Sequence, residues 1–258
     1  IQGGKLTKVA MDGTKSTFVD CGGGPNGAAV APDGSVYICN NGGQVASAGQ
    51  QKAEAGRIQR VAPDGTLSTI LTEVEGTALD APNDCAFDSE GGFWFTNPNG
   101  FGNPGSVCYL SPSGEATRVA SGIEFPNGIG ISPDGRYLVI CESMTGGLHS
   151  FEIEGPGKLG PRKTNGNIGR RSIPDGFCVD SQGRMIVAGF RTNNLFVLDM
   201  SDGKPLEIVE MPDTGNTNCC FGGPNFSTLF VTSSQKGEVL SIEWPVPGLV
   251  MPPPRVAK

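Results

Sequence analysis

The same short motif returns five times along the 258-residue chain, and this repetition limits the possible folds more than any other feature of the sequence. The motif is a proline followed by Asn or Asp and usually by glycine, and the last copy is degenerate. Its central polar residues lie between 43 and 57 residues apart; they are Asn26, Asn83, Asn127, Asp175 and Asn218. A period of about 40 to 50 residues is typical of the blades of a β-propeller.

Each repeat contains the strands that a blade needs. A glycine follows the motif's Asn or Asp by eight residues in four copies, and apolar or alternating segments lie on both sides of it; these glycines are Gly34, Gly91, Gly135 and Gly183. Two such segments around a tight turn predict an antiparallel hairpin. Each repeat then supplies a second pair, such as 56–61 with 67–71. Four strands without an intervening helix predict a propeller blade.

The fold class expected is therefore all-β, a six-bladed β-propeller that forms a single domain over residues 1–258. The chain begins with the outer strands 5–9 and 16–20 and ends with three strands, up to 238–243. This is three strands fewer than six complete blades need. The expected propeller lacks the first inner strand pair and the N-terminal closing strand, either because residues ahead of Ile1 are lost or because closure is made another way. Residues 44–55 are expected to form a surface loop and 247–258 a tail.

Composition excludes several classes of protein. The 40 glycines and 20 prolines disfavour a helical bundle. A formal net charge of −7 and the lack of a Lys/Arg-rich block argue against nucleic-acid binding. No apolar run approaches the roughly 18 residues of a membrane span.

The eight cysteines are dispersed and lack zinc spacing, so we expect reduced thiols and a cytoplasmic location. No signal peptide is visible, although the first residue is not Met. The protein is expected to be a monomer or weak homodimer.

The repeated polar residues predict a site. The first strand of each blade lines the central channel of a propeller, so equivalent positions on successive blades converge there. Four of the five converging residues offer amide oxygens, and Asp175 offers a carboxylate. Hard oxygen ligands of this kind suit Ca²⁺, Mg²⁺ or Mn²⁺. The alternative interpretation is that these are only turn sequences, since Asn, Asp and Gly are common in turns.

The same residues also resemble a known family. Residues 217–232, together with Ala81–Asp84, Phe125–Gly128 and Ile173–Asp180, are similar to segments of the SMP-30/gluconolactonase/luciferin-regenerating family of six-bladed propellers. The similarity runs from about residue 6 to about residue 249. Characterised members of that family are lactonases that depend on one divalent metal ion. The resemblance therefore implies a lactonase that acts on a small cyclic ester, with calcium as the first expectation and Mn²⁺, Mg²⁺ or Zn²⁺ as alternatives.

Site roles follow from the resemblance residue by residue. The family's metal-binding Asn corresponds to Asn127, and its metal-binding, catalytic Asp to Asp175. Asn83 corresponds to the Asn that faces metal-bound water or substrate, and we expect Asn83, Asn26 and Asn218 to contribute to substrate binding. The family's further ligand, a Glu in an early Glu-Gly-Pro motif, has no counterpart in the first blade. Its absence has the same expected cause as the missing strands.

Two departures from the family leave alternatives open. One is the absent Glu-Gly-Pro motif, since Glu154-Gly155-Pro156 has its letters but is expected in an outer hairpin. The other is Ala81, which stands where the family has an arginine two positions before Asn83. A propeller that binds a small molecule or a protein partner without catalysis is the alternative function. A different hydrolase with the same site is a third interpretation.

Several other features are interpreted as structural. The only histidine, His149, is expected in an outer strand, and Trp94 in a blade core. Cys219 and Cys220 are expected to point to opposite faces of one strand. Arg170 and Arg171 are interpreted as a solvated pair that could also contact an anionic substrate.

Overall fold

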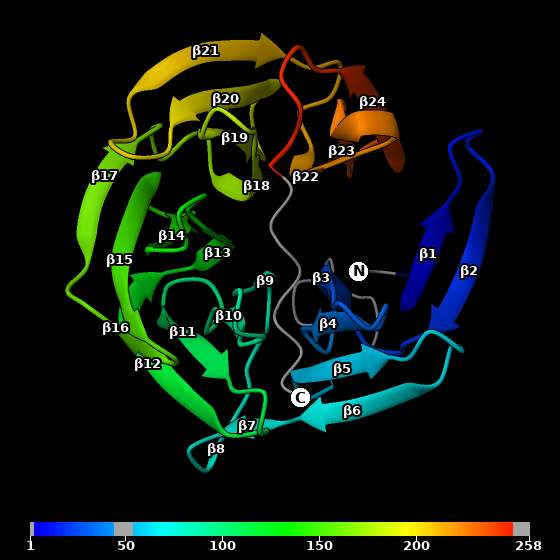
Figure 1. The fold of residues 1–258 in the computed structure, drawn as a ribbon, viewed down its shortest axis with the longest axis vertical. Helices are drawn as coiled ribbons and strands as arrows, with labels where there is room; N and C mark the ends of the chain where they lie inside the picture. Colours follow the sequence, from blue (N-terminus) through cyan, green and yellow to red (C-terminus); the bar gives the residue numbers. More distant parts are fainter. Residues whose placement is uncertain (1–2, 44–53, 250–258) are drawn as a thin grey trace. The chain divides into compact units, whose positions relative to one another are not determined.

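The computed structural model describes residues 3–43 and 54–249 of the chain. The expected surface loop at 44–55 lies almost wholly outside the described residues, as does most of the expected tail. The described chain divides into two compact units, the first ending at Phe125 and the second starting at Pro126. Each unit consists of antiparallel sheets (Figure 1). In the described residues the only helical segment is a single 3₁₀ turn at Pro224–Phe226, and none could span a membrane.

The first unit holds two four-stranded blades and two hairpins. One blade consists of β3 (Pro25–Val30), β4 (Val36–Asn40), β5 (Arg57–Val61) and β6 (Leu67–Leu71). The other consists of β9 (Cys85–Phe87), β10 (Phe93–Asn97), β11 (Pro104–Leu110) and β12 (Ala116–Glu124). The hairpins are β1 (Lys5–Val9) with β2 (Lys15–Asp20) and β7 (Glu73–Val74) with β8 (Thr77–Ala78).

The second unit holds three blades. The first contains β13 (Pro126–Ile131), β14 (Tyr137–Glu142), β15 (Gly147–Gly155), β16 (Lys158–Leu159) and β17 (Lys163–Asn167). The next contains β18 (Pro174–Val179), β19 (Arg184–Gly189), β20 (Asn194–Asp199) and β21 (Pro205–Glu210). The last contains only β22 (Asn216–Gly222), β23 (Thr228–Ser233) and β24 (Glu238–Glu243).

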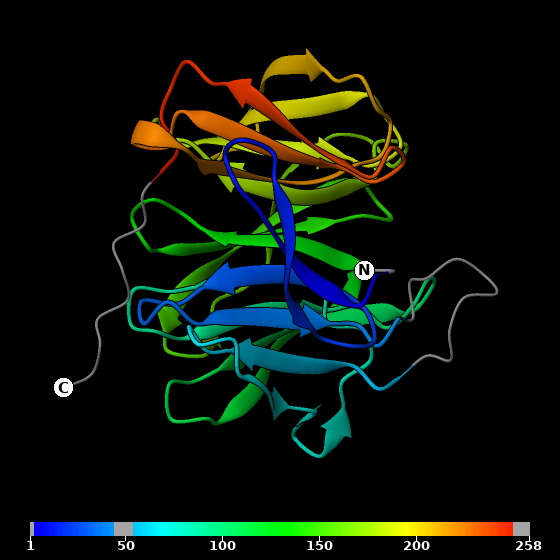
Figure 2. The ribbon, with the colours of Figure 1, turned by 90° about the vertical axis from the view of Figure 1, so that its right-hand side faces the viewer.

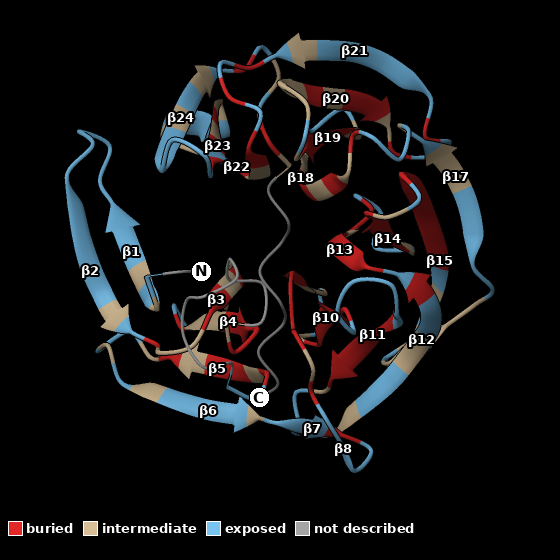
Figure 3. Cartoon of the chain, turned by 180° about the vertical axis from the view of Figure 1, so that it is seen from behind, coloured by how far each residue is buried: buried red, intermediate tan, exposed pale blue. Residues whose placement is uncertain are grey.

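The apolar cores lie between consecutive blades. Figure 3 shows the second strands β4, β10, β14 and β19 largely buried, while outer strands such as β6 and β21 are largely exposed. In the first unit, Cys39 and Ile58 of one blade pack with Phe93 and Phe95 of the next. Trp94 is fully buried and its Nε1 donates to Asp88 Oδ2 at 2.8 Å, which confirms its place in a blade core. Burial between stacked sheets is the main source of stability in such a fold.

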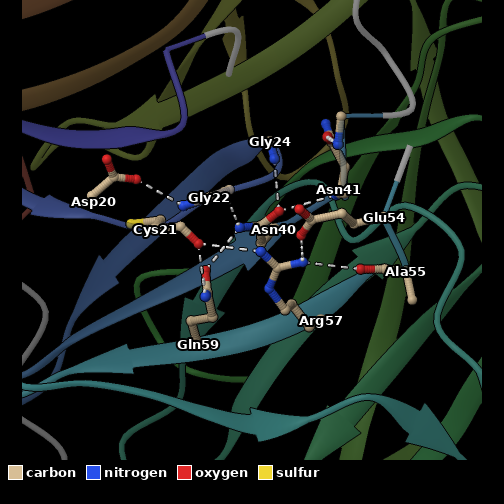
Figure 4. Close-up of polar contacts among 12 residues, drawn as sticks. Asp20, Cys21, Gly22, Gly24, Asn40, Asn41, Glu54, Ala55, Arg57 and Gln59 are labelled. Atoms are coloured by element: carbon tan, nitrogen blue, oxygen red, sulfur yellow. Dashed lines mark hydrogen bonds and ion pairs between the residues drawn. The ribbon is translucent and has the colours of Figure 1, made fainter. Parts of the chain in front are cut away.

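A buried polar network fixes the segment that follows the β1–β2 hairpin (Figure 4). Arg57 Nη2 and Gln59 Nε2 both donate to the carbonyl oxygen of Cys21, at 3.2 and 3.1 Å. Asn40 Oδ1 accepts from the backbone N–H of Gly24 at 2.8 Å, and Asn40 Nδ2 donates to the Gly22 carbonyl at 2.9 Å. These hydrogen bonds satisfy backbone groups that lie outside the strand ladders. They therefore fix the segment that connects the β1–β2 hairpin to the first blade; Figure 2 shows the hairpin and this blade from the side.

The structure confirms an all-β propeller and most of the expected strands. Gly34, Gly91, Gly135 and Gly183 all have positive φ values, between 72° and 88°, as tight turns at these positions require. Five blades are present in the described residues, with β1–β2 as a separate hairpin, so a sixth blade stays a prediction. The β7–β8 hairpin was not predicted, because its sequence has no alternating pattern. Of the expected tail, Gly248 pairs with Asp180 beside β18.

Candidate functional site

Four of the five repeated motifs lie at the start of the inner strands of their blades, and the copy at 82–84 directly precedes β9. Pro25, Pro126 and Pro174 are the first residues of β3, β13 and β18, and Asn216 begins β22. In all four strands the pairing register shifts within the motif, as between Pro126 and Ile129. Such bulges interrupt the ladder and re-aim side chains, and they are common next to active sites. The motif therefore places a polar residue at an irregular strand entrance.

Backbone strain occurs directly before two of the motifs. Phe125 and Ile173, which precede Pro126 and Pro174, have positive φ values of 58° and 41°. Few non-glycine residues adopt this conformation, and for the β-branched Ile173 it is a clear outlier. Strained backbone of this kind persists only where the surrounding structure enforces it, often at functional sites. The two strained positions lead into Asn127 and Asp175, the pair to which the family resemblance gives the role of metal ligands.

In the second unit, the entrances of three consecutive blades touch one another. A Cβ atom at Gly128 would lie 2.4 Å from the carbonyl oxygen of Asp175. A Cβ at Gly176 would lie 2.2 Å from the side-chain Oδ1 of Asn218. Neither glycine has a positive φ, so close approach and not turn geometry requires it. For these copies, turn geometry does not explain the glycine. The glycine is needed because one motif packs directly on the next.

Ser143 links the first two of these motifs. Asn127 Nδ2 donates to Ser143 Oγ at 3.1 Å, and Ser143 Oγ donates to the carbonyl oxygen of Pro174 at 2.7 Å. Asn127 and Ser143 are both buried, at 5% and 1% exposure. Because the amide nitrogen is bound to Ser143, the orientation of the Asn127 oxygen is fixed. Ser143 was not predicted from the sequence; the only available signal was its place directly after the second strand of the blade.

Asn218 differs from the other two motif residues in the second unit. Its Oδ1 accepts from the backbone N–H of Cys219 at 2.8 Å, and its own N–H donates to Thr232 Oγ1 at 2.9 Å. Cys219 is buried while Cys220 is exposed, as predicted for opposite faces of a strand. All eight cysteines carry free thiols. The Cys178 and Cys219 sulfurs lie 3.4 Å apart, and burial raises the pKa of Cys178 well above its usual range, so it remains a neutral thiol at neutral pH.

The first unit carries the other two predicted residues, and it brings them together. Asn26 Nδ2 donates to Asn83 Oδ1 at 2.9 Å. The backbone N–H of Gly27 donates to the carbonyl oxygen of Asn83 at 2.7 Å, and a Cβ at Gly27 would lie 2.5 Å from that oxygen. Asn83 is 7% exposed. Ala81, which replaces an expected arginine, is buried, and its N–H donates to Asn97 Oδ1 at 3.1 Å.

Two further residues lie as the sequence predicts. Glu154 lies near the β15–β16 turn and forms an ion pair with Lys158 at 2.9 Å, away from the motif end of its blade. His149 is buried in β15, where its Nε2 lies 3.1 Å from Glu142 Oε2 and its Nδ1 lies 3.1 Å from Thr164 Oγ1. Among the described residues no cluster of three or more His, Cys, Asp or Glu could hold a metal ion.

These features define a class: an all-β propeller whose inner strands present repeated amide and carboxylate groups at irregular entrances. A family model described as the SMP-30/Gluconolactonase/LRE-like region matches residues 1–235. The chain belongs to this family, as its motifs predicted.

Individual relatives agree with this membership. Diisopropyl-fluorophosphatase of Loligo vulgaris is 31% identical over 202 residues, which cover 71% of this chain and 64% of that protein. Regucalcin of Gallus gallus is 30% identical over 142 residues, covering 54% and 47% of the two chains. The chain thus spans less than two thirds of either relative. A solved gluconolactonase of Xanthomonas campestris matches with a TM-score of 0.77 at 25% identity, over 96% of this chain and 80% of that one.

Proposed function

We propose that this chain is a divalent-metal-dependent lactonase that hydrolyses a small cyclic ester. The observation that carries the proposal is the packing of the Asn127 and Asp175 motifs on each other, through Gly128 and through Ser143. Membership of a family that is named for a gluconolactonase supports the reaction class.

The residues present fit a hard divalent cation. Asn127 and Asp175 would hold it, because one offers an amide oxygen whose orientation Ser143 fixes and the other offers a carboxylate. Calcium is the first expectation for such oxygen donors, with Mn²⁺, Mg²⁺ or Zn²⁺ as alternatives. When bound, the ion would supply Lewis acidity at the ester carbonyl.

The remaining chemistry belongs to the chain. Asp175 accepts a proton as a water oxygen attacks the carbonyl carbon, and it returns a proton to the ring oxygen when the ring C–O bond breaks. The Oδ1 of Asn83 accepts from Asn26, so the amide nitrogen of Asn83 is the group that it can offer to the carbonyl oxygen of the substrate. Asn26 positions that amide, and Asn218 contributes a further polar contact to the substrate.

The test is the substitution Asp175→Asn, measured by a pH-indicator assay over a panel of lactones with EDTA and with each added metal. We expect turnover to fall by about 10² to 10⁴, because general-base assistance is lost. The fold should be unchanged. Asp202→Asn, in an exposed turn, is the matched control and should retain full activity. Near-wild-type turnover in Asp175→Asn with metal supplied would contradict the proposal.

A second hydrolytic function can be tested in the same assay. Because the similar Loligo vulgaris protein is a diisopropyl-fluorophosphatase, a phosphofluoridate ester belongs in the panel. If the protein hydrolyses the phosphofluoridate ester and hydrolyses none of the lactones, this second function is favoured over the lactonase. Metal binding without turnover of any substrate would instead support a non-catalytic binding propeller.

A further inference from the structure

Three arginines lie on loops at the motif end of the blade β18–β21. Arg170 and Arg171 belong to the segment that enters β18, and Arg191 belongs to the connection between β19 and β20. All three are exposed. Strand direction places both loops at the same end of the blade, since Pro174 at the start of β18 pairs with Gly189 at the end of β19. This is the end that carries Asp175.

The two loops are joined at the strained residue. The backbone N–H of Phe190 donates to the carbonyl oxygen of Ile173 at 3.2 Å. Ile173 is two residues from Arg171 and two residues from Asp175, and Phe190 precedes Arg191. The three guanidinium groups therefore extend from backbone segments that border the entrance of β18.

The segment that carries Arg170 and Arg171 is held in place by several contacts. Ser172 donates from its N–H to the Gly169 carbonyl at 2.9 Å and from its hydroxyl to the Ile168 carbonyl at 2.8 Å. Asn167 Nδ2 donates to the Thr145 carbonyl at 3.1 Å. The backbone also packs tightly on Gly146, where a Cβ would come within 2.7 Å of the Arg170 nitrogen. The backbone of the two arginines is thus fixed while their side chains reach into solvent.

None of these three guanidinium groups has a carboxylate within ion-pair distance in the described part of the chain. Arg184, in contrast, pairs with Asp180 at 2.6 Å, and Arg136 lies 3.7 Å from Glu152. Two acidic residues of this unit have other partners: Glu142 lies against His149, and Glu210 accepts from Asn193 at 2.9 Å. A net charge of −7 disfavours the approach of anions to the protein as a whole. Three arginines without an acidic partner at one end of a blade are therefore unexpected.

We propose that Arg170, Arg171 and Arg191 form a subsite for an oxyanion group of the substrate, a carboxylate or a phosphate carried apart from the ester that is cleaved. Guanidinium groups bind such groups through paired hydrogen bonds. That the bound anion is part of a substrate rests on the proposed function, whereas anion binding by itself requires no turnover. It refines the expected substrate class from a neutral lactone to an anionic one.

Binding is measured first, by isothermal titration of the full chain with inorganic phosphate and, separately, with succinate at low salt. Wild-type protein should bind at least one of the two, and the preferred anion identifies phosphate or carboxylate. The double variant Arg170→Gln/Arg171→Gln and the single variant Arg191→Gln should each lose about tenfold or more in affinity, the usual scale for hydrogen bonds to charged groups. Arg136→Gln, an arginine at the opposite end of a blade, should bind as wild type does.

Kinetics provide the second arm, with a neutral lactone compared with the same ring bearing a carboxylate or a phosphate. In the arginine variants we expect KM for the anionic lactone to rise about tenfold, with kcat/KM for the neutral lactone nearly unchanged. Anion binding without turnover of any lactone would support the subsite and reject the lactonase. Absence of anion binding, or an equal loss in Arg136→Gln, would overturn the subsite whatever the activity.

Discussion

Ser143 joins two motifs of the proposed site through its side-chain hydroxyl. Its hydroxyl accepts from Asn127 and donates to the Pro174 carbonyl, so it connects the two motifs that are proposed to share a metal ion. Outer groups that orient metal ligands typically change metal affinity by 10- to 100-fold when removed. Ser143 is therefore expected to act as a positioning residue.

Ser143→Ala should weaken calcium binding by about tenfold or more, because Asn127 loses the bond that orients its amide. Stability should also fall by about 1–3 kcal/mol, since two buried polar groups lose a partner. Calcium titration and urea unfolding measure the two effects separately. Ser150→Ala is the matched control: Ser150 is buried in the same blade, and its hydroxyl donates at 2.7 Å to Asn165 Oδ1, which is not a motif residue. Equal losses of calcium affinity in both variants would reject a specific role for Ser143.

Some residues of the proposed site are marked in the sequence much more clearly than others. Asn127 and Asp175 were predictable because a repeated motif marks them, and the same motif marked Asn26 and Asn83. Ser143 and Arg191 were not, because each is an ordinary polar residue in a loop, and the place of that loop beside a motif depends on hydrogen bonds between segments distant in the sequence. The positive φ of Ile173 was also beyond prediction, since a β-branched residue before proline favours extended backbone.

At the scale of strands, the central feature is the close packing of consecutive inner strands. Strand positions were well predicted, because turn glycines and alternating segments are local signals. The strand starts were less accurate: the motif prolines belong to β3, β13 and β18, and the bulges that follow them leave no pattern in the sequence. The glycines that follow Asn26, Asn127 and Asp175 were open to a turn interpretation, and only their close contacts with the neighbouring blade show why each must be small.

Gly128→Ala tests this packing. The added methyl group would lie 2.4 Å from the Asp175 carbonyl oxygen, and that oxygen is part of a strand that cannot easily move. We expect a loss of about 3 kcal/mol in unfolding free energy, near the upper end for overpacking of a core. Gly155→Ala is the control, because no atom lies within 4 Å of its Cβ position and its φ is not positive. Similar stability of the two variants in urea would show that the motifs are not packed this closely.

At the scale of the whole molecule, hairpin turns recur with an aspartate that accepts a backbone N–H two residues further on. Asp12, Asp33 and Asp64 share this arrangement, and the backbone bond lowers the pKa of each carboxyl group below its usual value. Since folding favours the ionised form, the stabilisation is complete above the unfolded pKa of about 3.9 and is lost as the pH falls through the lower, folded-state pKa. These hairpins therefore share one source of acid sensitivity.

We expect the urea midpoint to fall as the pH is lowered below about 4. The double variant Asp12→Asn/Asp64→Asn should show a shallower fall, because the amide keeps an acceptor oxygen but does not titrate. Unfolding curves between pH 7 and pH 3 measure this. A pH dependence as steep as that of the wild type would assign the acid sensitivity to other groups.

The global architecture was predictable because a repeat period is a property of the whole chain, and the family model agrees with it. The single domain expected over residues 1–258 and the sixth blade stay predictions, because both depend on how distant parts of the chain assemble. That assembly is decided by contacts between blades and leaves little trace in local sequence patterns.

The most direct measurement is a crystal structure of the chain soaked with Mn²⁺, with the ion located by anomalous scattering. One site is predicted, with Asn127 Oδ1 and an Asp175 carboxylate oxygen both within about 2.6 Å of the ion, the upper end of metal–oxygen bonds in such sites. The peak should be absent from crystals of Asp175→Asn. An ion bound elsewhere, or side chains of Asn127 and Asp175 that point away from each other, would contradict the metal centre and the hydrolysis proposed from it.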